Sequence, residues 1–125
     1  MDSDEDDDII KPERLPIYRK GKEIFDKVGK ICALIPENDE QLNEIKSWML
    51  SDAAQLSVKV AGAEAAGLYD LKMENAAIIR KAARDLIVQQ HSLDMFGFEY
   101  VEYYQIVREL IEEYRLLFID WVAGF

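Results

Sequence analysis

The chain has 125 residues, and its 15 basic and 25 acidic side chains give a formal net charge of −10, which disfavours binding to the phosphate backbone of nucleic acids. Cys32 is the single cysteine, which excludes an intrachain disulfide and a cysteine-rich metal site. The acidic N-terminus has no signal-peptide character and no apolar run is long enough to span a membrane, so we expect a cytoplasmic protein without membrane contact.

The N-terminal segment is strongly acidic. Its first eight residues include Asp2, Asp4, Glu5, Asp6, Asp7 and Asp8. A block of like charges repels itself and has little apolar surface to bury, so we expect residues 1–14 to form a disordered, flexible tail. The tail either aids solubility or docks on a basic partner.

The first predicted helix covers about residues 16–35, between two prolines that suit its two ends. Its apolar side chains recur at helical spacing: Ile17, Ile24, Phe25, Val28, Ile31, Cys32 and Ile35. Gly21 and Gly29 each weaken a helix by about 1 kcal/mol relative to alanine. They either permit a close helix contact or are simply tolerated.

Two helices of similar length are expected next. Asn38 or Asp39 can cap a helix over about residues 40–66, whose stripe is Leu42, Ile45, Met49, Ala53, Leu56, Val60 and Ala63. A third helix over about residues 70–95 has the stripe Ala76, Ile79, Ala83, Leu86, Gln90 and Leu93, and Gly97 is expected to end it. Gly67 is either the turn between them or a kink in one long helix.

The last predicted helix, about residues 99–123, has the clearest pattern. Apolar and aromatic residues alternate at spacings of four and three, which is a heptad repeat: Tyr100, Tyr104, Val107, Ile111, Tyr114, Phe118, Trp121 and Phe125. Four helices with short connections predict an all-α, antiparallel up-down-up-down four-helix bundle over residues 15–125. The small residues of the two middle helices fit the large aromatics of the last one.

The sequence offers little for catalysis, and we expect no metal, cofactor or catalytic residue. His91 is the only histidine and lacks the Glu-x-x-His pattern of di-iron bundles. Glu99/Glu102 and Glu109/Glu112 have a spacing used for magnesium, but both pairs oppose the heptad repeat on one helix and are expected to face solvent.

Three charged residues in the middle of the chain are the candidate interaction or ion-pair residues: Glu64, Arg80 and Arg84. Arg80 and Arg84 are four residues apart and therefore share one helix face with Ile87. An interhelical ion pair, such as Glu64 with Lys72 or with an arginine, would fix the helix register. The alternatives are a subunit interface and a clamp for an anion or a partner's carboxylate.

The leading functional hypothesis is a non-enzymatic bundle that acts by protein–protein association, as a homo-oligomer. It rests on apolar residues beyond one stripe per helix, namely Trp48, Leu50, Leu68, Tyr69, Phe96, Phe98 and Tyr103. A small-anion or nucleotide-binding domain that uses Arg80 and Arg84 is the first alternative. Nucleic-acid binding, the second alternative, would need a basic face drawn from Lys11, Arg14, Arg19, Lys20, Lys22, Lys27 and Lys30.

The run from Val60 to Gly67, followed by the segment from Met73 to Ile79, resembles the bacterial 23S rRNA intervening-sequence family of four-helix-bundle proteins. The family has an Asn-Ile-Ala-Glu-Gly-type segment at the end of its second helix. Here the asparagine is missing, and Ala63, Glu64 and Gly67 spread the Ala-Glu-Gly part over five positions. The resemblance implies a small oligomerising bundle without established catalysis, and RNA binding is not carried over.

Overall fold

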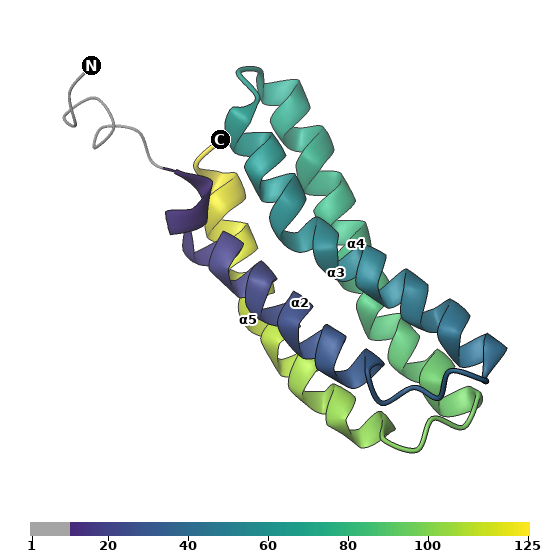
Figure 1. Ribbon diagram of the computed structural model, residues 1–125. Helices are drawn as coiled ribbons and strands as arrows, with labels where there is room; N and C mark the ends of the chain where they lie inside the picture. Colours follow the sequence, from purple (N-terminus) through teal and green to yellow (C-terminus); the bar gives the residue numbers. More distant parts are fainter. Residues whose placement is uncertain (1–10) are drawn as a thin grey trace.

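A computed structural model describes residues 11–125. Within this range the chain forms four α-helices and no strand (Figure 1): α2 (Pro16–Cys32), α3 (Glu40–Ala65), α4 (Tyr69–Met95) and α5 (Tyr104–Ala123). The predicted all-α fold with four helices is confirmed. Residues 1–10 of the predicted tail lie outside the described residues, and the next residues form a 3₁₀ turn, η1 (Pro12–Arg14).

The helix boundaries differ from the prediction mainly at the ends of α2 and α5. Beyond Cys32 the backbone forms tighter turns, in which an N–H donates to the carbonyl three residues earlier. Leu34 N–H donates to the Ile31 carbonyl, and Ile35 N–H donates to the Cys32 carbonyl. A 3₁₀ turn, η2 (Val101–Tyr103), precedes α5, which therefore begins five residues later than predicted.

The residues that the sequence analysis placed between the helices lie in the connections: a capping residue and two glycines. The Asp39 side chain caps α3 by accepting a hydrogen bond from Leu42 N–H at 3.0 Å. Gly67 lies in a turn rather than a kink, since Ala66 and Leu68 on either side of it are extended. Gly97 follows α4 with a φ of 76°, a backbone conformation that glycine adopts without strain.

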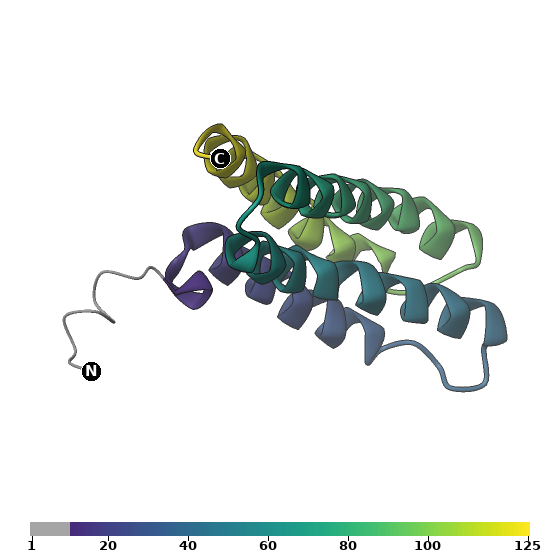
Figure 2. The ribbon, with the colours of Figure 1, turned by 90° about the horizontal axis from the view of Figure 1, so that it is seen from above.

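The four helices lie in two layers around a shared hydrophobic core (Figures 1 and 2). Viewed as in Figure 1, α2 and α3 form the front layer and α5 and α4 the back layer. Helix α3 packs extensively on α4 and on α2, and α2 also packs on α5. By contrast, α4 and α5 make few direct contacts. The back layer is therefore the most open side of the bundle.

Two buried tyrosines of α5 form hydrogen bonds to α4 and α3. The Tyr104 hydroxyl donates to the Leu86 carbonyl of α4 at 2.6 Å, and the Tyr114 hydroxyl donates to the Leu56 carbonyl of α3 at 2.7 Å. Burial raises the pKa of both phenols above the usual range, so both remain donors. These two tyrosines, Val107 and Ile111 confirm the middle of the predicted heptad repeat as core, and the residues of the repeat before and after them are partly buried.

The two glycines of α2 have different surroundings. A β-carbon at Gly21 would lie 2.5 Å from the Leu56 carbonyl oxygen, whereas one at Gly29 would meet nothing within 4 Å. Gly21 therefore permits α2 to approach α3 at the same carbonyl that accepts the Tyr114 hydroxyl. Gly29 has no such role in the contact between these helices.

The buried stripe of α4 differs from the prediction at two positions. It contains Ala82 and Gln89, where the sequence pattern indicates Ala83 and Gln90, and its other four residues are buried as predicted. The two changes follow from packing, because α4 turns its apolar face toward α3 rather than toward α5. The buried Gln89 donates its side-chain amide to Asp52 of α3 at 2.9 Å, and burial raises the pKa of that carboxyl above its ordinary value.

Candidate interaction site

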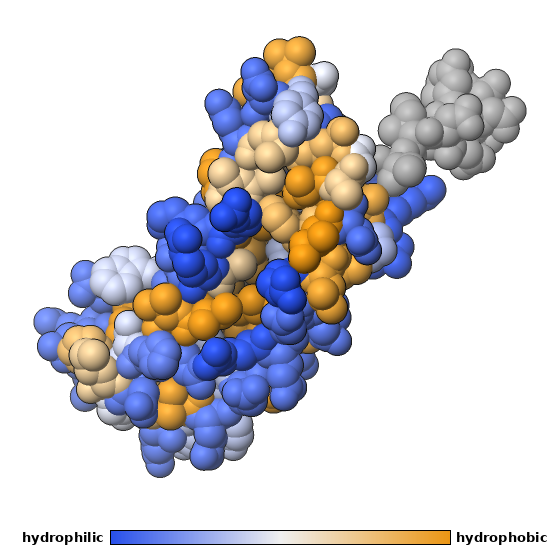
Figure 3. Space-filling model, turned by 180° about the vertical axis from the view of Figure 1, so that it is seen from behind, coloured by the Kyte–Doolittle hydropathy of each residue, from blue (hydrophilic) through white to orange (hydrophobic). Residues whose placement is uncertain are grey.

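An open groove runs between α4 and α5 and has a volume of about 370 Å³. Its walls are mostly apolar and include Ile79, Ala83, Ile87, Ile111, Tyr114, Phe118 and Ile119. Seen from behind, hydrophobic surface forms a band along this face, with strongly hydrophilic side chains on both sides of it (Figure 3). The groove stays open because α4 packs on α3 and makes few contacts with α5.

Contacts between α5 and its neighbours bracket the groove. On the α5 N-terminal side, the Arg108 guanidinium donates to the Gln90 side-chain oxygen of α4 at 3.0 Å. On the other side, the Lys72 ammonium lies 5.7 Å from the centre of the Phe125 ring. The open stretch is therefore confined to the middle of the bundle, where residues 79–87 face residues 111–119.

The rim of the groove carries more positive than negative charge. Arg115 binds Glu112 with a nitrogen–oxygen distance of 2.7 Å, and this hydrogen bonding lowers the pKa of the Glu112 carboxyl. Arg80 and Arg84 complete the rim on α4; both are exposed, and neither forms an ion pair with any residue from 11 to 125. A local positive rim contrasts with the chain's net charge of −10.

The structure places the three predicted residues at two different sites. Arg80 and Arg84 lie together on the groove, with Ile87 beside them, as their spacing indicated. Glu64 does not line the groove; its carboxylate accepts a hydrogen bond from the Trp121 indole N–H at 3.2 Å. Lys72, considered as a partner for Glu64, instead donates to the Ala63 carbonyl at 3.1 Å.

Other apolar residues from the sequence analysis do not form one patch. Phe98 is buried and Leu50 packs against the core, so neither contributes the surplus exposed surface expected of it. The remaining residues are exposed, but they are spread over α3 and the two ends of the bundle: Trp48, Leu68, Tyr69, Phe96 and Tyr103. Five groove residues belong to the predicted core stripes, which is why sequence reasoning missed the groove itself: Ile79, Ala83, Ile111, Tyr114 and Phe118.

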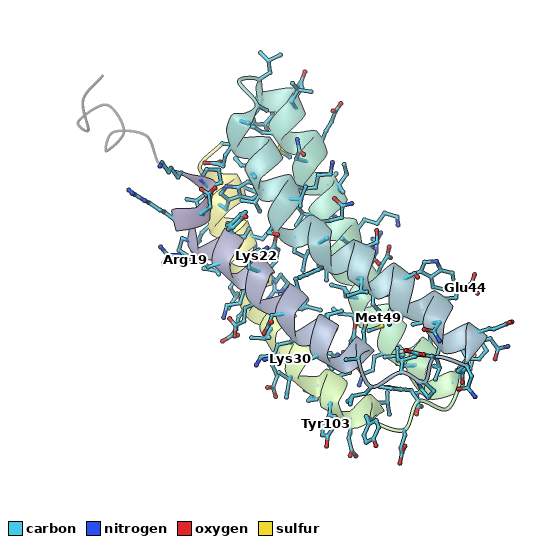
Figure 4. The ribbon with its side chains drawn as sticks, in the orientation of Figure 1. Arg19, Lys22, Lys30, Glu44, Met49 and Tyr103 are labelled. Atoms are coloured by element: carbon cyan, nitrogen blue, oxygen red, sulfur yellow. The ribbon has the colours of Figure 1, made fainter. Side chains whose placement is uncertain are left out.

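Basic residues of α2 lie on the opposite face from the groove. Arg19, Lys22 and Lys30 project from α2 in the front layer (Figure 4). Lys20 binds Glu23 and Glu113, and Lys30 binds Asp26, so part of this basic face is neutralised by neighbouring acids.

The described residues contain neither a cluster of metal ligands nor an exposed thiol. Over residues 11–125, no three side chains from histidine, cysteine, aspartate and glutamate come together where they could hold a metal ion. Burial raises the pKa of the Cys32 thiol to about 11, which keeps it protonated at neutral pH. None of the helices in this range is long and apolar enough to cross a membrane.

Comparisons with protein-family models, curated proteins and solved structures found no significant match to this chain. The resemblance to the intervening-sequence family therefore stays a prediction.

Proposed function

We propose that the protein is a non-enzymatic, cytoplasmic up-down-up-down bundle that acts by associating with a second copy of itself through the α4/α5 face. The observation that carries this proposal is the open apolar groove between these helices. Covering the exposed apolar side chains of the groove is favourable, because removing apolar surface from water is a main driving force of association.

Several side chains around the groove add to this surface. Ile119 is 51% exposed on the groove wall, and Leu116, one turn earlier on α5, is 55% exposed. Phe118 is partly buried beside them. Apolar side chains that are half in contact with the core and half in water are preorganised for a partner, because their rotamers are already restricted.

A pair of matched substitutions tests the role of this face. Ile119→Gln replaces an apolar groove residue that is 51% exposed, and Trp48→Gln replaces one on α3 that is 52% exposed. Glutamine is a good helix former, so both variants are expected to fold. Light scattering should give a weaker self-association for Ile119→Gln alone. Equal effects of the two substitutions would contradict the choice of face.

The exposed Arg80 and Arg84 also favour a second candidate, a small-anion or nucleotide site at the groove rim. Guanidinium groups bind phosphate and carboxylate oxygens in a bidentate manner. Thermal unfolding with inorganic phosphate or a nucleoside triphosphate should then show stabilisation, and Arg80→Gln with Arg84→Gln should abolish it. An unchanged unfolding temperature at saturating ligand would reject this candidate.

A further inference from the structure

We propose that α5 of one copy lies over the groove of the other, with the acidic residues around its exposed apolar ridge opposite the partner's arginine rim. The inference rests on the proposed self-association and adds which surfaces meet. It assigns Arg80 and Arg84 the role of binding carboxylates from the second copy.

The outward face of α5 has the composition of a docking helix. Leu116 and Ile119 are three residues apart and form an exposed apolar ridge. Exposed acids share this face at helical spacings from Leu116: Glu109 seven residues before, Glu112 four before and Asp120 four after. Glu109 and Asp120 form no ion pair within residues 11–125.

The α4 side of the groove has the complementary charge. Arg80 and Arg84 stand beside the apolar walls, so one surface combines apolar area with positive charge. The α5 ridge combines apolar area with the negative charge of Glu109 and Asp120, since Arg115 neutralises Glu112. Opposite charges orient two surfaces and select the partner, although each exposed pair adds little affinity. Since each copy carries a net charge of −10, local attraction at this contact also offsets the general repulsion between copies.

A two-fold axis uses both complementary surfaces at once. The α5 of each copy then meets the α4 rim of the other, as expected for an isologous interface. A helix of 20 residues is roughly 30 Å long, and two neighbouring helices present a face roughly 20 Å wide. The contact would thus cover roughly 600 Å² per copy, or about 1,200 Å² in total, which is within the range of specific interfaces.

Two variants with reversed charges, one on the arginine rim and one on α5, test whether these surfaces meet in the dimer. The first variant carries Arg80→Glu and Arg84→Glu, and the second carries Glu109→Lys and Asp120→Lys. Each variant alone places like charges opposite each other and should self-associate at least about tenfold more weakly than the unmodified chain. Their equimolar mixture restores both attractive contacts and should form a heterodimer with close to the original affinity.

A control variant with the same change in net charge as the first variant separates a local contact from a general charge effect. Lys22→Glu with Lys27→Glu alters α2, in the other layer, and should leave self-association unchanged at about 0.15 M salt, where charges further apart than about 8 Å are screened. If the unmodified chain dimerises but the mixture fails to restore dimers, the proposed contact is wrong while self-association stands. If the unmodified chain is monomeric, both proposals are wrong.

Discussion

Replacing Gly21 by alanine should destabilise the protein, and replacing Gly29 should stabilise it. At Gly21 the added β-carbon would lie 2.5 Å from the Leu56 carbonyl oxygen, 2.8 Å from the Leu56 carbonyl carbon and 3.1 Å from the Ser57 nitrogen. These are backbone atoms of α3 and cannot rotate away. Ordinary contacts begin at 3.4 Å, so α2 and α3 must separate by the difference of 0.9 Å at this point.

The expected magnitude combines two opposing effects. Overpacking a well-packed contact costs about 1–3 kcal/mol, and a backbone clash belongs at the upper end of that range. Alanine in place of glycine inside a helix contributes about 1 kcal/mol of stabilisation. The net effect of Gly21→Ala should thus be a loss of about 2 kcal/mol, and Gly29→Ala should gain up to about 1 kcal/mol.

Urea unfolding followed by circular dichroism measures both variants. The two midpoints should move in opposite directions, with unchanged slopes if only stability changes. The helix-propensity gain is common to both variants, so their difference isolates the contact between α2 and α3. A Gly21→Ala variant as stable as Gly29→Ala would refute the close approach of these helices at Leu56.

Two further predictions concern polar groups that form hydrogen bonds between helices. Tyr104→Phe and Tyr114→Phe should each cost about 0.5–1.5 kcal/mol in urea unfolding, and the losses should add, because the hydroxyls bond to different helices. A larger loss of stability from phenylalanine at either position would contradict the hydrogen-bond explanation and indicate a change in packing. The folded-state pKa of Asp52 is raised, so the folded state binds more protons than the unfolded state above the ordinary aspartate pKa. Ionising Asp52 therefore lowers stability as pH rises through that window, and Asp52→Asn should be more stabilising, relative to the unmodified chain, at neutral pH than at about pH 4. If the stability difference between Asp52→Asn and the unmodified chain is the same at both pH values, the raised pKa of Asp52 is contradicted.

Sequence periodicity predicted the four helices well, because their apolar residues recur at helical spacing and prolines or glycines separate them. The heptad repeat of α5 identified Tyr104 and Tyr114 as core residues, and the structure buries both. The repeat could not reveal that the two hydroxyls donate to backbone carbonyls of α4 and α3. Those bonds depend on which helical turns of α4 and α3 lie beside each tyrosine in the folded bundle.

The two changed positions of α4 could not be read from the sequence for a specific reason. Ala82-Ala83 and Gln89-Gln90 are identical pairs, so residue type does not indicate which member of each pair faces the core. Only packing on α3 decides between them. That choice leaves Ala83 on the groove and Arg80 and Arg84 on its rim, which is why the arginines were found from spacing but the groove was not.

The two glycines of α2 show the same limit. Gly21 and Gly29 have equal intrinsic helix propensity, and the sequence left both of their possible roles open. The backbone of α3 lies against one and not the other.

The mass of the unmodified chain in solution tests the central claim most directly. Light scattering over a concentration series from about 1 µM to about 200 µM reports the monomer–dimer equilibrium by mass action. We predict a mass that rises toward twice the 14.4 kDa of one chain. A mass that stays at 14.4 kDa over the whole series would contradict self-association through the α4/α5 face.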